Sequence, residues 1–144
     1  MLVLSPRAVT FEMGDDAETW SGVSAVVIDR KVTRAVVDWS DDGPHVAFAD
    51  AAEIEVRVRV TQSLDEASAD GPAAGAEGTL RFIAAPGRAG TRRRRVSCAC
   101  VVLSVSHEVS ERRAGVRTIE LVGVSADGGA SDPVTVESAF EGVS

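Results

Sequence analysis

Two histidines are the residues of this chain that could most readily support catalysis. His45 follows Asp41 and Asp42, and His107 precedes Glu108, so each imidazole has a carboxylate near it in the sequence. A Ser–His–Asp site could be assembled on paper, but no G-x-S-x-G turn marks a serine as a nucleophile. Walker, G-x-G-x-x-G and EF-hand motifs are absent from the sequence as well. The sequence therefore predicts a protein that is not an enzyme.

Cys98 and Cys100 are the only cysteines, and they stand two residues apart in a predicted strand. Side chains at this spacing point to the same face, which is a poor match for the geometry of a disulfide. A single C-x-C also lacks the second ligand pair of a structural zinc site. We expect both to be small buried core residues, and we expect neither a metal nor a cofactor.

Four consecutive arginines, Arg92, Arg93, Arg94 and Arg95, form the strongest local charge signal. Such a run could contact phosphate, could lie on a solvated face, or could pair with carboxylates. The chain carries a net charge of −7, which disfavours binding to nucleic acid. Pairing with acidic groups, within the subunit or across an interface, is the interpretation that we prefer.

The segment EIEVRVRV, residues 53–60, indicates what kind of element positions these side chains. Ile54, Val56, Val58 and Val60 alternate with charged residues, and side chains of a strand point to opposite faces with a period of two. This segment therefore predicts a strand with one buried face and one wet face.

Similar patterns predict strands throughout the chain, separated by turn signals such as SDDGP at 40–44. Residues 29–31 are expected to form a hairpin turn, and 63–68 a short helix with Ser63 as its N-cap. The apolar parity changes near residues 101–103, which a β-bulge or burial on both sides would explain. The predicted strands are 9–13, 20–28, 32–39, 53–61, 79–85, 92–106, 116–125 and 134–136, with GDDAE as a polar turn after the first.

We expect a mainly β fold: an antiparallel β-sandwich or barrel of seven or eight strands with at most one short helix. The 144 residues fit a single domain, 1–144, with a long loop at 62–78 and a flexible C-terminus at 137–144. The N-terminus lacks the pattern of a signal peptide, and no apolar run is long enough to span a bilayer. We therefore expect no membrane partner and synthesis in a cytosol.

Four segments, read in order, resemble the small tail proteins of tailed bacteriophages and most closely tail tube proteins. They are HVAFADAAEIEVRVRVTQSL, GTLRFIAAPGRAG, RRRRVSCACVVLSVSHEV and VRTIELVGVSADGGASDPV, which together span about residues 45–135. The resemblance implies a tail-tube-like sandwich, with six subunits forming a ring whose inner strands close a barrel. It also implies that rings stack, that other tail proteins are partners, and that DNA passes an acidic lumen without specific binding during ejection.

Transferred to this sequence, the resemblance makes residues 32–39, 53–61, 92–106 and 116–125 the candidates for the lumen. Glu53, Glu55 and Glu120 would be charges of the wall. The loop 63–78 and the hairpin tip 107–115 would make contacts between rings. Inter-subunit contacts would come from the arginines that share the charged faces or begin the long strand, namely Arg57, Arg59, Arg92, Arg93, Arg94, Arg95 and Arg117.

The leading hypothesis is therefore a structural virion protein of a phage or phage-derived tail tube. A tail terminator, a head–tail connector or a distal tail ring protein is an alternative with a related small β fold. A non-catalytic bacterial β-sandwich binding module is the alternative from another class. The scarcity of aromatic residues, at 4%, disfavours sugar binding by such a module.

Overall fold

The computed structural model describes residues 2–4, 6–64, 71–84, 93–111 and 113–138, and within them the chain is entirely β. The described part contains no helix, and so none that could span a membrane. The predicted class, mainly β and antiparallel, is confirmed. The strands are β1 (Leu2–Leu4), β2 (Pro6–Met13), β3 (Asp16–Thr19), β4 (Val23–Trp39), β5 (Val46–Ser63), β6 (Glu77–Ala84), β7 (Arg94–Ser110), β8 (Arg113–Gly123) and β9 (Val134–Ser138).

The strands form one antiparallel sheet in the order β1-β4-β5-β8-β7-β6-β2-β3, and β9 pairs with β7 outside this path. A flat sheet in this order would hold β4 and β2 far apart. The sheet instead curls over itself, because buried residues of β2, β4, β5, β6, β7 and β8 all belong to one hydrophobic cluster. The fold is thus a sandwich made from a single bent sheet.

The core confirms the alternation for residues 55–60, whereas Ile54, expected on the same buried face, is 64% exposed. Val56, Val58 and Val60 are almost completely buried, whereas Arg57 and Arg59 between them are exposed. The same face of β4 contributes Val26 and Ile28 to the core. Phe11 and Trp20 stack at one end of this core with ring centroids 5.3 Å apart. The expected burial of Cys98 and Cys100 in β7 is also confirmed, and both thiols are free.

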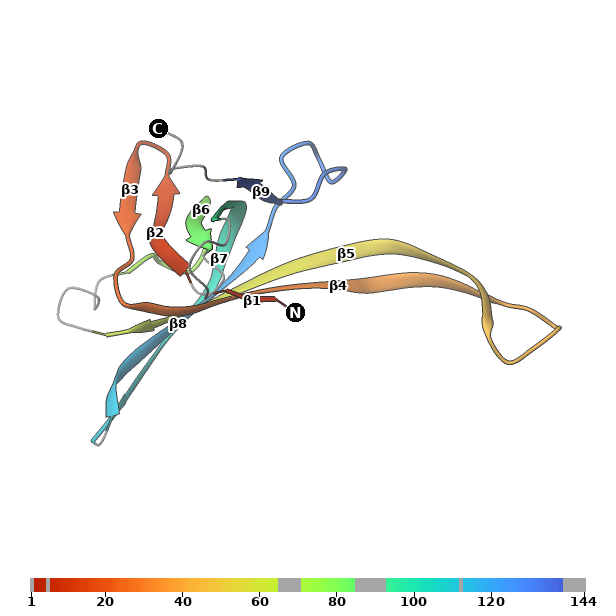
Figure 1. Ribbon diagram of the computed structural model, residues 1–144, viewed down its shortest axis with the longest axis horizontal. Helices are drawn as coiled ribbons and strands as arrows, with labels where there is room; N and C mark the ends of the chain where they lie inside the picture. The colour runs from red at the N-terminus through yellow and green to blue at the C-terminus, as the bar shows by residue number, and fades with distance from the viewer. Residues whose placement is uncertain (1, 5, 65–70, 85–92, 112, 139–144) are drawn as a thin grey trace.

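Two hairpins leave this body in different directions (Figure 1). The longer hairpin joins β4 to β5 through the turn at 40–45, which confirms the turn predicted at SDDGP. Nearly every residue from 32 to 54 is exposed, and we call this segment the arm. The shorter hairpin joins β7 to β8, and its strands extend to Ser110 and from Arg113. The connection between these two strands is therefore shorter than the one predicted at 107–115.

The hairpin turn predicted at 29–31 is wrong. Asp29, Arg30 and Lys31 lie in the middle of β4, where they pair with Arg57, Val56 and Glu55 of β5. The three residues offer no glycine, proline or asparagine for a tight turn. The predicted strands 20–28 and 32–39 are consequently parts of a single strand that begins at Val23.

Smaller differences affect the N-terminal part and the loops. The polar segment GDDAE contains only a two-residue turn, because β3 begins at Asp16 and pairs with β2. Ser63, expected to cap a helix at 63–68, is the last residue of β5, and residues 65–68 of that predicted helix lie outside the described residues. The predicted β-bulge is confirmed, since the register of β7 against β8 shifts between Val102 and Ser104.

Candidate assembly surface

Ion pairs cover the outer face of β4, β5 and β8, opposite the core. Arg59 lies 3.5 Å from Glu120 of β8, and Arg34 lies 3.9 Å from Glu53 across the hairpin. Arg57 pairs with Glu55 on the same strand, and its Nε donates a hydrogen bond to the glutamate. A shallow groove between these strands is lined by Val27, Asp29, Lys31, Arg57, Val58, Arg59 and Glu120.

The charges on this face balance. Four acidic residues, Asp29, Glu53, Glu55 and Glu120, stand against Lys31, Arg34, Arg57 and Arg59. The three glutamates expected to form an acidic wall therefore lie together, and each has an arginine partner. Such solvent-exposed pairs contribute little to stability, about 0–1 kcal/mol each. What they provide is a hydrophilic surface without a strong excess of either charge.

Arg117 does not lie on this face. Its side chain is only 1% exposed, because β8 places Arg117, Ile119 and Leu121 on the core side and Glu120 on the other. The Nε of Arg117 donates to Oε1 of Gln62 at 3.0 Å, and the guanidinium lies 6.0 Å from the Trp20 ring. The prediction that Arg117 shares the charged face is wrong, since residues 117 and 120 differ in parity along the strand.

Burial lowers the pKa of Arg117 from its usual value, and the Glu18 carboxylate opposes this shift. The main chain of Gly71 passes against the guanidinium, since a Cβ on this glycine would lie 2.0 Å from Nη1 of Arg117. The described end of the predicted contact loop, residues 71–76, is thus packed against the body. Its Gly75 amide also donates to the Val102 carbonyl at 2.7 Å.

The arginine run begins β7 at the end of the body where β6 and β9 finish. Arg93 precedes the strand, Arg94 and Arg95 open it, and all three are exposed. Arg95 stands between Ile83 of β6 and Glu137 of β9 in the sheet register. Arg92 lies outside the described residues.

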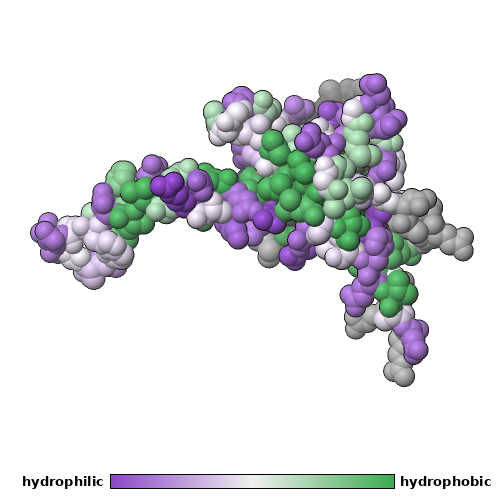
Figure 2. Space-filling model, turned by 180° about the vertical axis from the view of Figure 1, so that it is seen from behind, coloured by the Kyte–Doolittle hydropathy of each residue, from purple (hydrophilic) through white to green (hydrophobic). Residues whose placement is uncertain are grey.

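The arm carries an apolar surface that the sequence reasoning missed. Cross-strand partners share a face, and the pairs Ala35–Ala51, Val37–Ala49 and Trp39–Val46 are entirely apolar. Val36 pairs with Asp50, and Asp38 pairs with Phe48, so the opposite face is mixed. Figure 2 shows apolar patches on the arm where it stands clear of the body. Exposed large side chains of the arm are Val32, Val36, Val37, Trp39, Val46, Phe48 and Ile54.

The arm also presents two open backbone edges among the described strands. On one side, β1 pairs with β4 only at residues 26–28, which leaves the rest of β4 toward Trp39 without a neighbour there. On the other side, β8 reaches only as far as Arg57 of β5. Open edges of this length can pair with strands of another chain. The arm is therefore suited to contacts between chains, through both its side chains and its backbone.

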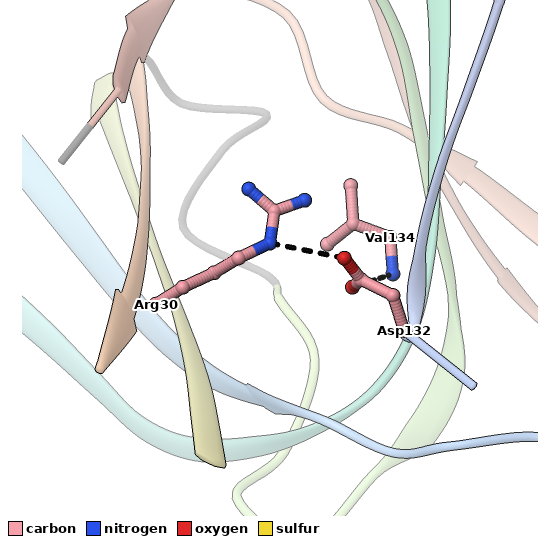
Figure 3. A network of polar contacts seen from close by, with 3 residues as sticks. All are labelled: Arg30, Asp132 and Val134. Carbon is pink, nitrogen blue, oxygen red and sulfur yellow. Dashed lines mark hydrogen bonds and ion pairs between the residues drawn. The ribbon is translucent and has the colours of Figure 1, made fainter. Parts of the chain in front are cut away.

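A polar clamp marks the boundary between the body and the arm (Figure 3). Arg30 of β4 donates to Oδ2 of Asp132 at 3.1 Å, and Oδ1 of Asp132 accepts the Val134 amide at 2.9 Å. Pro133 beside this clamp packs close to Gly123 and Val56, as the short distances from a Cβ built on Gly123 show. The loop before β9 thus covers the core face as far as Val56, and the face beyond it stays uncovered.

The residues considered for chemistry are not brought together. His45 lies in the turn of the arm and His107 in the β7–β8 hairpin, and both are exposed. Within the described ranges no three His, Cys, Asp or Glu side chains are grouped as metal ligands. The hydrogen bond with Cys100, together with burial, raises the pKa of the Cys98 thiol, so this residue remains a neutral core side chain.

Two solved structures share this fold. No protein-family model matches the sequence, and no curated protein sequence matches it. A chain from the tail of an empty gene transfer agent particle, obtained with helical refinement and C6 symmetry, superposes with a TM-score of 0.56 at 12% identity. This likeness covers 90% of the present chain and 94% of that chain.

A chain from the virion of a native gene transfer agent particle gives a TM-score of 0.53, also at 12% identity, over 90% and 95% of the two chains. At this identity the comparison establishes a common fold. The resemblance to phage-like tail proteins drawn from the sequence is confirmed at that level: the chain has the fold of a tail particle subunit.

Proposed function

We propose that this protein is a structural subunit of the tail tube of a phage or phage-derived particle, and that six copies form each of a series of stacked rings. The observation that carries the proposal is the shared fold, because nearly the whole of both chains is covered and the other chain comes from a tail with C6 symmetry. In this proposal the protein resides in the virion tail after synthesis in a host cytoplasm. It contacts other tail proteins at the ends of the tube and has no catalytic role.

The open edges of the arm support assembly into rings. A strand edge that is left unpaired is a hazard for a soluble monomer, and closure of a ring satisfies it. A ring needs only two complementary surfaces on each subunit, repeated by rotation. We propose that β4 of one subunit pairs with the β7–β8 hairpin of the next, so that β4, β5, β8 and β7 continue around a barrel.

The charged face of β4, β5 and β8 is the surface that we propose for the wall of the bore. It is hydrophilic, and its glutamates Glu53, Glu55 and Glu120 hold arginines that would otherwise attract phosphate. Removal of these carboxylates would leave Arg34, Arg57 and Arg59 unmatched. DNA passes such a wall without specific binding because the arginines are already paired.

Electron microscopy of the purified protein tests the proposal directly. Stacked rings or long tubes with a central hole are expected. One closed ring that does not stack would contradict the tube and favour a tail terminator. A chain that remains monomeric at high concentration, and also in the presence of preformed tail ends from the same particle, would refute a role in the tube.

A triple variant, Glu53→Gln, Glu55→Gln and Glu120→Gln, tests the wall. Each subunit loses three negative charges, so we expect tubes to assemble while DNA delivery falls by about tenfold or more, since unpaired arginines hold phosphates. Glu77→Gln, at an exposed position on β6, is the matched control and should leave delivery unchanged. Delivery that is the same in the triple variant would show that this face is not in the bore.

A further inference from the structure

The tip of the arm, which we define as residues 38–50, is strongly acidic. It contains Asp38, Asp41, Asp42 and Asp50 but no lysine or arginine. No ion pair joins these aspartates to any described cation, in contrast to the glutamates near the root of the arm. The tip therefore carries four negative charges that have no counter-charge within the described part of the subunit.

Aromatic side chains accompany these acids. Trp39 is 65% exposed and Phe48 is 55% exposed, although the core of the same molecule buries Trp20 and Phe11. Large aromatic residues surrounded by charges are typical of the centre of a protein–protein contact. The face of the arm that carries Phe48 also carries Asp38 and Asp50, and it predicts a basic partner surface that also offers apolar contact.

The body of the same chain contains a surface of this kind. We define the basic cluster as Arg7, Arg93 and Arg95, all of them exposed. Arg7 and Arg95 flank Ile83 in the sheet register, so their positions are in one row across β2, β6 and β7. Ile83, which is only partly buried, supplies an apolar side chain on this face, whereas Arg94 pairs with Ala84 and lies on the other face.

The two surfaces cannot meet within one subunit. The arm projects away from the body, and its tip lies at the far end of the molecule from β2, β6 and β9 (Figure 1). Strand pairing from Val26 to Trp39, with register shifts between Val32 and Ala35 and before Trp39, holds it extended. A basic surface that contacts the tip must therefore belong to another copy of the chain.

We propose that the acidic arm tip of one subunit docks on the basic cluster of a second copy of the same chain. The aspartates then pair with arginines, and Phe48, on the face of the arm that also carries Asp38, leaves water against Ile83 between Arg7 and Arg95. This inference rests on the proposed function, because stacked rings supply the second copy. It assigns an inter-subunit contact to the basic cluster: the arm tip of a neighbouring subunit.

A charge-swap experiment tests the proposal. One variant reverses the tip (Asp41→Arg with Asp42→Arg), a second reverses the cluster (Arg7→Asp with Arg95→Asp), and a third carries all four changes. Asp15→Arg with Asp16→Arg is the matched control, since it makes the same charge change at two exposed positions where the β2–β3 turn enters β3. Circular dichroism verifies the fold of each variant, and sedimentation velocity with electron microscopy measures assembly.

Each two-residue reversal is expected to raise the concentration needed for assembly by about tenfold or more at low salt, because like charges then face each other. The four-residue swap should restore assembly to within about threefold of the parent, since both signs are exchanged. The control should assemble like the parent.

Two results would overturn the proposal while leaving the tail tube intact: normal assembly of the reversed-tip variant, or a swap variant no better than either reversal. A parent chain that never assembles would instead refute the proposed function itself.

Discussion

Arg117 and Gln62 form a buried pair whose coupling can be measured. Arg117 is 1% exposed and Gln62 is 2% exposed, and the amide oxygen of Gln62 accepts hydrogen bonds from two nitrogens of the guanidinium. The amide nitrogen of Gln62 donates to the Ser21 carbonyl. The pair therefore ties β8 to β5 and to the segment that leads into β4, all on the core side of the sheet.

Replacement of one member removes the hydrogen bonds that join the two buried side chains. Gln62→Leu removes two hydrogen bonds to a charged group, and at about 1.5–3 kcal/mol each the free energy of unfolding should fall by about 3 kcal/mol or more. Arg117→Met keeps the contact with Trp20 but leaves the Gln62 oxygen without this donor, at a cost of about 1–3 kcal/mol. The double variant removes both polar groups and should be less destabilised than Gln62→Leu alone, because a matched apolar replacement of a buried polar pair is often nearly neutral.

A double-mutant cycle in urea provides the measurement. Trp39→Phe is the background, so that fluorescence reports only on Trp20, which lies 6.0 Å from the guanidinium of Arg117. A favourable coupling of at least about 2 kcal/mol is expected between the two sites. Additive costs, with no coupling between Arg117 and Gln62, would refute the interpretation that this pair is a buried polar link.

Two further predictions concern the body. Gly78→Ala should destabilise the protein by about 2–3 kcal/mol, measured by thermal unfolding, because the new Cβ would lie 2.4 Å from the main-chain oxygen of Glu12; Gly43→Ala, with open space around it, is the control. Hydrogen bonds from Ser125 and Ser131 lower the pKa of Asp127 to about 2, so its contribution to stability should be complete above the ordinary pKa of about 4 and be lost as the pH falls toward 2. Carboxyl NMR titration measures this pKa directly, and a value near 4 would contradict the hydrogen bonding.

The alternation of apolar and polar residues predicted those features of the fold that depend on one strand packing against the core. The alternation at residues 53–60 identified the core side of β5, and the change of parity near Leu103 identified the bulge in β7. Both signals depend on the two-residue period of a strand against one buried face. Where a strand leaves the body, this alternation no longer predicts burial. Ile54 has the parity of Val56 but is 64% exposed.

The candidate surface was only partly predictable for the same reason. Glu53, Glu55 and Glu120 were assigned to one wall through the resemblance to tail tube proteins, and the structure does place them on one face. The burial of Arg117 was not foreseen, since a charged residue in an alternating strand is ordinarily assigned to the wet side. The arm was missed because the charged triplet at 29–31 was interpreted as a turn, which divided one seventeen-residue strand into two.

The arm itself is the strongest reason to regard the isolated subunit as incomplete. A two-stranded ribbon in water is at best marginally stable, and this ribbon extends beyond the clamp of Arg30 with Asp132, where coverage of the core face ends. On the face of the arm that continues the core face, the cross-strand pairs remain apolar from Val32–Ile54 to Trp39–Val46. No described element covers this face of the arm. Burial of such apolar side chains is favourable by about 25 cal/mol for each Å² removed from water. A surface that covers them therefore stabilises the assembly. The subunit thus folds with a complete core but leaves open strand edges and an uncovered apolar arm. We expect assembly to bury this arm and to pair these edges.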